Sequence, residues 1–284
     1  MNKKIIALIA SSILGITCFI FYSFTKCHSQ ILEIHSFNQV NFYAIAADTL
    51  VIFDVDETLI KPVDNYVLNE HTSEVKEFRQ RTFTKFPKEE QDLFHGIMLN
   101  EAARPLIESY IIDKINNLKD LGITVIACTA MKTGKKATFN RFEVWRYNQL
   151  KSVGFEGSFN NLDFELQGFK SKPVFYRGIL AVDQETKGSV IGAFLDHMHL
   201  HPKKIIMFDD TADYLKTVQN ECCKRKIEFV GYNYLGGDYT VPWDQELSQF
   251  QADYLIEHHH WLPDAQARKL MHQSRKMTPV AVEP

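Results

Sequence analysis

Short β-rich runs alternate with longer stretches of helical periodicity along most of the chain, and this pattern constrains the fold more than any other feature. The clearest runs are apolar on both faces, as buried strands of a parallel sheet require. They cover residues 49–54, 123–129, 204–210 and 227–234, with a short further run at 178–182. Helical patterns cover residues 104–121, 135–153, 187–200, 211–225 and 244–274. The alternation predicts an α/β fold with a Rossmann-like parallel sheet.

Two segments are too long to be simple connections between a strand and a helix. Residues 60–103 are charged, rich in aromatic side chains and mostly helical in pattern, so they predict a helical cap inserted after the first strand. Residues 154–177 contain scattered Asn, Gly and Pro and predict a long loop or a small second lid. The predicted core then consists of residues 31–59 and 104–284.

The first thirty residues, 1–30, differ in composition from the rest. Lys3 and Lys4 precede an uncharged apolar run from Ile5 to Phe24, which is long enough to span a bilayer. An uncleaved signal anchor and a cleaved signal peptide both fit this pattern. The lysine pair is expected to stay in the cytoplasm, so the protein is predicted to be exported or anchored, with its N-terminal segment in or through a membrane and its main domain periplasmic or otherwise extracytoplasmic.

Composition narrows the class of protein. A chain of 284 residues with 45% hydrophobic content can bury a full-sized core. Its formal charge of −3 lacks the excess of basic residues that attracts a polynucleotide, so we expect no nucleic-acid partner. The five cysteines show no metal-type spacing, which favours mostly buried or free thiols.

The chemically informative feature is the acidic cluster DVDET, which follows TLVIF directly and contains Asp54, Asp56 and Thr58. Ligands of open parallel sheets bind beyond the carboxyl ends of the strands. Two other predicted strands also end in groups suited to phosphate or metal, namely Thr129 and the pair Asp209 and Asp210. The sequence therefore predicts a site for phosphate and metal at this edge.

These residues resemble the four motifs of the haloacid dehalogenase (HAD) superfamily, in the same order. Asp54 and Asp56 match the first motif, and Thr129 matches the hydroxyl that ends the second strand. Lys187 in TKGSVIGAFL matches the basic third motif, and the two aspartates in IIMFDDTADYL match the acidic fourth. The texture of residues 130–185 and the tail WLPDAQARKL also resemble a poorly characterised bacterial group within that superfamily.

The residue types suit hydrolysis of a phosphate monoester. Asp54 would attack phosphorus and become an aspartyl phosphate, while Asp56, two residues on, would protonate the leaving oxygen and then activate water. A cation must lie between two anionic partners, and hard oxygen ligands suit Mg²⁺. The resemblance implies Asp54, the main-chain carbonyl of Asp56, and Asp210 as metal ligands, with Asp209 as a further ligand or as the holder of a metal-bound water.

The resemblance also implies that Thr129 and Lys187 bind the transferring phosphoryl oxygens. Lys170 and Lys172 lie upstream, and a single lysine is usually a solvated charge. Asp213 is a candidate support residue that would orient Lys187 or metal-bound water, although an acid in the first turn of a helix also favours the helix dipole.

Two other functions fit the same residues. One is a membrane-tethered protein that uses a catalytically decayed HAD core to bind a phosphorylated ligand or protein partner. The other is a phosphotransferase that passes the group to an acceptor other than water. For the hydrolase, the expected substrate is a phosphorylated small molecule or a phosphopeptide, and no motif in the predicted cap names it.

Overall fold

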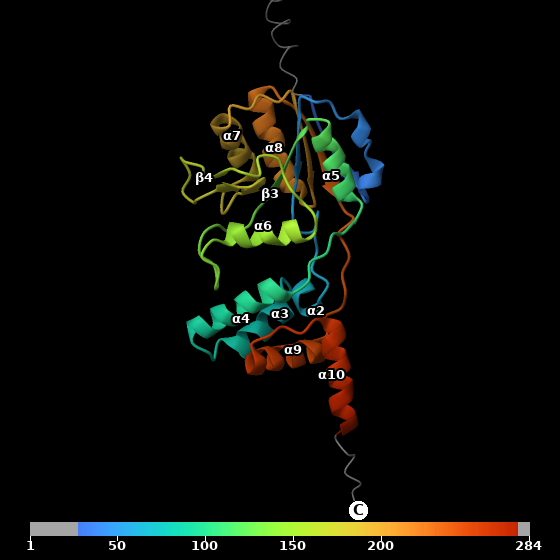
Figure 1. The fold of residues 1–284 in the computed structure, drawn as a ribbon, viewed down its shortest axis with the longest axis vertical. Coiled ribbons are helices and arrows are strands. Elements are labelled where there is room, and N and C mark those ends of the chain that lie inside the picture. Colours follow the sequence, from blue (N-terminus) through green and yellow to red (C-terminus); the bar gives the residue numbers. More distant parts are fainter. Residues whose placement is uncertain (1–27, 278–284) are drawn as a thin grey trace, which may run out of the picture.

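A computed structural model describes residues 28–277 and confirms the α/β prediction, with one eight-stranded sheet covered by helices (Figure 1). The strands are β1 (Ser29–Ile34), β2 (Thr49–Phe53), β3 (Thr124–Thr129), β4 (Asp163–Glu165), β5 (Val174–Tyr176), β6 (Ile179–Ala181), β7 (Lys204–Asp209) and β8 (Glu228–Tyr234). Their order is β1-β8-β7-β2-β3-β6-β5-β4. The strands from β1 to β6 in this order run parallel, and β5 and β4 add an antiparallel edge.

Helices pack on both faces of the sheet. The helices are α2 (Asn65–Leu68), α3 (Ser73–Phe83), α4 (Lys88–Glu101), α5 (Ile111–Asp120), α6 (Phe142–Ser152), α7 (Lys187–His197), α8 (Ala212–Arg225), α9 (Gln245–His258) and α10 (Asp264–Met277). One face buries apolar side chains of α5, α6 and two short 3₁₀ turns, Phe37–Gln39 and Phe42–Ala44. The other face buries side chains of α7 and α8. The sheet is therefore the middle layer of three.

The structure differs from the sequence prediction at several boundaries. A strand, β1, precedes Thr49, so residues 60–103 follow the second strand in chain order rather than the first. The helix predicted to begin at residue 104 begins at Ile111, because Pro105 and Ile107 lie in a segment that hydrogen-bonds to residues 59–63. Residues 154–177, predicted to be a loop or lid, contain β4 and β5, which extend the sheet.

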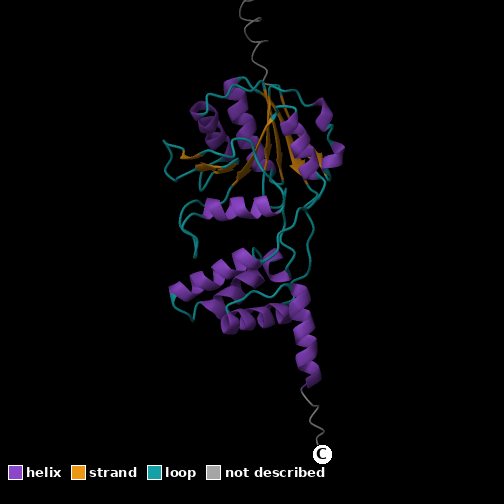
Figure 2. Ribbon diagram, in the orientation of Figure 1, coloured by secondary structure: helices purple, strands orange, loops and turns teal. Residues whose placement is uncertain are grey.

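A second unit of the molecule consists of helices alone (Figure 2). It combines the inserted helices α2, α3 and α4 with the C-terminal helices α9 and α10 (Figure 1). Buried side chains of the insertion, including Phe78 and Phe94, form one cluster with Leu255 of α9 and with Trp261, which precedes α10. The C-terminal helices were predicted to belong to the core, but α9 packs on the insertion, and α10 packs on α9 through a separate cluster of Leu247, Leu262 and Ala267.

Buried polar contacts join the two parts of this helical unit. Asp64 accepts hydrogen bonds from Trp261 Nε1 and from the main-chain N–H of Asp264, each at 3.0 Å. Glu101, at the end of α4, accepts one from the main-chain N–H of Trp261 at 2.8 Å. An unmade hydrogen bond at a buried site is costly, so these contacts hold α9 and α10 in a defined position on the insertion.

Some sequence predictions concern residues that the structure does not describe. The apolar run from Ile5 to Phe24 lies outside the described residues. Between residues 28 and 277, none of the helices has the length and apolar character needed to span a bilayer. Cys128 and Cys222 are buried free thiols, as expected, whereas Cys223 is disulfide-bonded.

Candidate active site

The acidic cluster lies at the carboxyl edge of the sheet, directly after the central strand β2. Strand β2 pairs with β3 on one side and with β7 on the other, and Phe53 is opposite Ala127 and Phe208. The main-chain N–H of Asp54 continues this ladder by donating to the carbonyl of Phe208 at 2.8 Å. Because parallel strands end at the same edge, the residues that follow them meet there, as the sequence predicted.

A tight turn follows Asp54 and carries Asp56. The main-chain N–H groups of Leu59 and Ile60 both donate to the carbonyl of Val55, at 2.9 and 3.0 Å. Glu57 adopts a left-handed backbone with φ of 59°, which is uncommon for a residue other than glycine. The turn keeps Asp54 and Asp56 on the wall of one cavity.

Lys187 is a fully buried charge of the site, as is Asp209. It is the first residue of α7, and its side chain is 0% exposed. Its Nζ donates to Asp54 Oδ1 at 2.5 Å and to Asp209 Oδ2 at 2.7 Å. The predicted competitors Lys170 and Lys172 lie on the segment before β5 and form no contact with these aspartates among the described residues. The lysine assigned from sequence is therefore the one at the acidic cluster.

Three carboxylates converge at the same place. Oxygens of Asp54, Asp209 and Asp210 all lie within 4.8 Å of one another, an arrangement that could hold a metal ion. The main-chain N–H of Asp210 donates to Thr58 Oγ1 at 3.1 Å, and that of Thr211 donates to Asp209 Oδ1 at 3.0 Å. These contacts connect the β2 turn to the end of β7 and orient the acids.

Burial and mutual repulsion govern the protonation of these groups. Burial raises the pKa of Asp54 to about 7, with Lys187 opposing the rise and Asp209 adding to it. Burial likewise raises the pKa of Asp210 to about 6, and the charge of Asp54 adds to this rise. Burial alone would lower the pKa of Lys187, but Asp54 and Asp209 outweigh it and hold that pKa above its ordinary value. The lysine is therefore charged among acids that repel one another.

Thr129 and Asp213, which were also proposed from the sequence, lie in different surroundings. Thr129 is buried at the end of β3, lines the same cavity, and accepts a hydrogen bond from the main-chain N–H of Met131 at 3.4 Å. The side chain of Asp213 is 86% exposed and forms an ion pair with Lys216 at 2.9 Å. Asp213 does not line the cavity, so the supporting role suggested for it is not one its position allows. Thr211 makes the contact to Asp209 instead.

The cavity has a volume of about 470 Å³ and lies between the sheet edge and the helical unit. Its far wall holds basic and aromatic side chains that sequence reasoning missed, namely Arg104, Lys136, Trp145 and Arg146. Arg146 Nη2 donates to Asp56 Oδ2 at 2.8 Å, across a separation of 90 residues. No local pattern could reveal this contact, because a basic residue on a helix usually faces solvent.

Helix α6 carries Arg146 and lies between the sheet and the helical unit (Figure 1). It packs on β5 and β6, and its Phe142 and Trp145 form a small apolar cluster with Leu99 of α4. The rings of Phe142 and Trp145 are stacked, with centroids 4.5 Å apart. One helix thus joins both units and supplies part of the wall between them.

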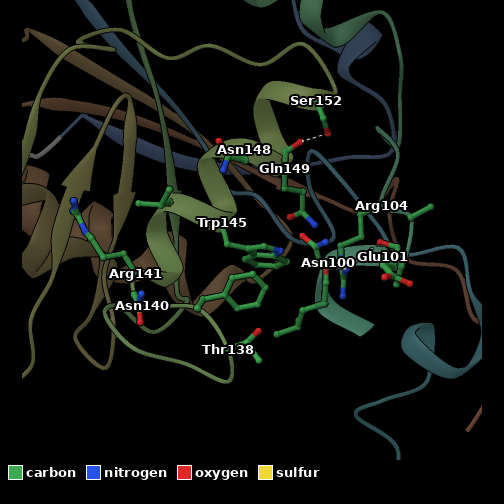
Figure 3. A pocket seen from close by; sticks show the side chains of 15 residues that line it. Asn100, Glu101, Arg104, Thr138, Asn140, Arg141, Trp145, Asn148, Gln149 and Ser152 are labelled. Carbon is green, nitrogen blue, oxygen red and sulfur yellow. Dashed lines mark hydrogen bonds between the residues drawn. The ribbon is translucent and has the colours of Figure 1, made fainter. Parts of the chain in front are cut away.

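A second cavity of about 710 Å³ lies on the other side of Trp145. It shares Leu99, Arg104 and Trp145 with the cavity that contains the aspartates. Figure 3 shows Trp145 and Gln149 extending from α6 toward Asn100 on α4. The two cavities are neighbours, and Asp54, Asp56 and Asp210 line only the first.

A comparison with known families matches residues 33–268 to the family described as Protein of unknown function (DUF2608). The chain belongs to this family. The match covers the sheet, the site and most of the helical unit. The description of the family names no activity.

Similar proteins come from Rickettsia. An uncharacterised protein of Rickettsia prowazekii (strain Madrid E) is 24% identical over 269 residues, which are 87% of this chain and 93% of that protein. One from Rickettsia bellii (strain RML369-C) is 24% identical over 67% of this chain and 70% of its own length. One from Rickettsia conorii (strain ATCC VR-613 / Malish 7) is 25% identical over 72% of this chain and 77% of its own length. No solved structure matches the chain.

Proposed function

We propose that this protein is a Mg²⁺-dependent phosphohydrolase of the HAD type, which cleaves a phosphate monoester through an aspartyl phosphate on Asp54. The observation that carries the proposal is the group of three carboxylates around one buried lysine, at the carboxyl edge of a parallel sheet. Perturbed ionisable groups gathered in a cavity are typical of catalytic sites.

The donor set fits Mg²⁺. Asp54, Asp209 and Asp210 supply hard oxygen ligands, and the three carboxylates with one lysine leave a net charge of two negatives when all are ionised. A divalent cation would match that charge. When bound, it would neutralise the phosphoryl oxygens and allow two anions to approach.

The two catalytic aspartates have different surroundings, which suit different roles. Asp54 is buried, so its carboxylate is poorly solvated and can act as the nucleophile that attacks phosphorus. The side chain of Asp56 is 49% exposed and is held by Arg146, so it can donate a proton to the leaving oxygen and then take one from water. Lys187 and Thr129 lie at the sheet edge, where they would contact the transferring oxygens.

The test uses purified protein, Mg²⁺ and 4-nitrophenyl phosphate. Asp54→Asn should reduce turnover to background, whereas Asp213→Asn, a matched change at an exposed acid, should leave it intact. Mass spectrometry after acid quenching should find a phosphoryl group on the peptide that contains Asp54. Metal-dependent turnover by Asp54→Asn would contradict the proposal.

The same experiment separates the alternative functions. Saturable binding of phosphate compounds by folded protein without turnover would favour the phospho-ligand-binding protein. A change in product ratio on adding alcohol acceptors would instead identify a phosphotransferase.

A further inference from the structure

Two cations on the far wall of the aspartate cavity have no carboxylate partner. Arg104 donates from Nη1 to the main-chain carbonyls of Leu99 and Ala102, at 3.2 Å each. The Nζ of Lys136 lies 4.3 Å from the centre of the Phe142 ring. Among residues 28–277, neither cation forms an ion pair with an acidic side chain. A partly buried cation usually has such a partner, because removing a charge from water is costly.

The electrostatics of this wall agree with the contacts. Burial lowers the pKa of Arg104, and the nearby charge of Arg146 lowers it further. Burial also lowers the pKa of Lys136; Glu70 opposes this change, and Arg146 adds to it. Glu70 also lines the cavity, but it forms no ion pair with either cation; its contact at 3.7 Å is with His71 Nε2, which is charged only when protonated. Positive charge on this wall is therefore only partly balanced by the protein.

The neighbouring cavity shares Arg104 with the aspartate cavity, but its other charged side chains, Glu101 and Arg141, have charged or hydrogen-bonding partners. Arg141 forms ion pairs with Glu143 and Asp163, each at 2.7 Å. Glu101 accepts hydrogen bonds from His260 and from the main chain of Trp261. Among the charged side chains that line the larger cavity, Arg104 alone has no acidic partner among residues 28–277 (Figure 3), whereas the aspartate cavity has Lys136 as a second such cation.

The unpaired cations do not belong to the phosphoryl end of the aspartate cavity. Lys187 and Thr129 come from the sheet edge, whereas Arg104 follows α4 and Lys136 lies on the connection from β3 to α6. A cavity of about 470 Å³ exceeds what a phosphoryl group needs and has room for a small leaving group.

We propose that the leaving group of the substrate carries its own anionic group, a carboxylate or a second phosphate, which Arg104 and Lys136 bind. This inference rests on the proposed phosphohydrolase function. It names the substrate class as a small phosphate ester with negative charge at both ends. Charge-assisted hydrogen bonds to the second anion would supply the partners that these two cations lack.

The experiment compares three substrates with the same three-carbon chain. They are 3-hydroxypropyl phosphate, 3-phosphooxypropanoate and propane-1,3-diol bisphosphate. We expect kcat/KM to be about tenfold or more higher for at least one of the two anionic-tail substrates than for the hydroxyl-tail substrate. The two anionic arms distinguish a carboxylate from a phosphate, and the preference should weaken as salt is raised.

Substitutions assign the preference to the two cations. Lys136→Gln and Arg104→Gln should each bring the ratio of kcat/KM values toward one, while Lys136→Arg should retain most of it. Lys135→Gln, a neighbouring change at an exposed lysine, should leave the ratio unchanged. Arg104 also binds two main-chain carbonyls, so if Arg104→Gln unfolds the protein, the Lys136 variants alone decide the result.

Failure of this inference can be told from failure of the proposed function. Equal kcat/KM for the three substrates, with normal Mg²⁺-dependent turnover of 4-nitrophenyl phosphate, would overturn the anionic leaving group alone. The same conclusion would follow if Lys136→Gln and Arg104→Gln, both folded, kept the wild-type ratio. Absence of turnover with every phosphate ester would overturn the proposed function and this inference with it.

Discussion

The cations on the two sides of the aspartate cavity differ in their burial and in their partners. At the sheet edge, Lys187 is buried between Asp54 and Asp209, with both partners in hydrogen-bond contact. On the far wall, Arg104 and Lys136 are only partly buried and contact main-chain oxygens or an aromatic ring. The contacts of the buried lysine at the sheet edge are thus complete within the protein, whereas the far wall leaves two cations without an acidic partner among the described residues.

The ion pair between Asp56 and Arg146 connects the two walls. Asp56 follows the central strand, and Arg146 comes from the helix that packs on both units. The side chain of Arg146 is 5% exposed, and its Nε has no hydrogen-bond partner among the described residues. This ion pair therefore links the end of β2 to α6 where the two units meet.

The largest effect expected from breaking the contact between the two walls is on turnover, from Asp56→Asn. This change removes a proton donor but leaves the contacts of Lys187 intact, so steady-state turnover should fall by about 10²–10⁴-fold. A substrate with a good leaving group should still phosphorylate Asp54, and the phosphoenzyme should accumulate. Rapid quenching followed by mass spectrometry measures it. If Asp56→Asn lost phosphoenzyme formation as well as turnover, the assignment of Asp54 as nucleophile and Asp56 as proton donor and base would be wrong.

A stability experiment sharpens the contrast between the walls. Lys187→Met leaves Asp54 and Asp209 without their buried cation, so we expect unfolding free energy at pH 8 to fall by about 3 kcal/mol. Lys216→Met, at an exposed ion pair, should change it by no more than about 1 kcal/mol. Urea denaturation measures both. Equal effects would show that the buried network does not depend on its lysine.

The helical unit can be tested through the contact that joins its two parts. Trp261→Phe keeps an aromatic ring but removes the donor to buried Asp64, and it should lower the unfolding free energy by about 1–3 kcal/mol. Hydrogen exchange should show amides of α2, α3 and α9 losing protection together. Amides of β2 and β7 should keep theirs if the sheet unit opens separately. Loss of protection in α9 alone would contradict a single helical unit.

A further expected effect is a pH dependence of stability in metal-free protein. The pKa of Asp54 is raised from 3.8 to about 7 in the folded protein, so its contribution is present below pH 3.8 and is lost as pH rises through 7. The lowered pKa of His95, about 4, acts in the opposite direction below pH 6.5. We therefore compare the melting temperature of the wild type with that of Asp54→Asn from pH 4 to 8.

The difference between the two proteins cancels the contribution of His95. The melting temperature of the wild type should fall relative to that of Asp54→Asn as pH rises toward 7. Saturating Mg²⁺ should reduce this slope, because metal binding favours the ionised carboxylate. A difference that stays constant with pH would show that Asp54 titrates normally in the folded protein.

The sequence by itself determined the parallel sheet and the residues at its edge. Buried strands require continuous apolar runs, and parallel strands end at one edge, so Asp54, Thr129 and Asp209 were expected to meet from their positions alone. The strand register confirms that they follow neighbouring strands. Local pattern was sufficient here because the backbone geometry of a sheet leaves little freedom.

Only the tertiary structure decided the far wall and the composition of the helical unit. The contact from Arg146 to Asp56 spans 90 residues, and that from Trp261 to Asp64 spans 197. Helical periodicity shows which face of a helix is apolar but does not identify the element that covers it. For the same reason, Asp213 seemed a plausible supporting residue until its exposed position in the first turn of α8 was known. Contacts between distant helices depend on how whole units pack, and that information is not local.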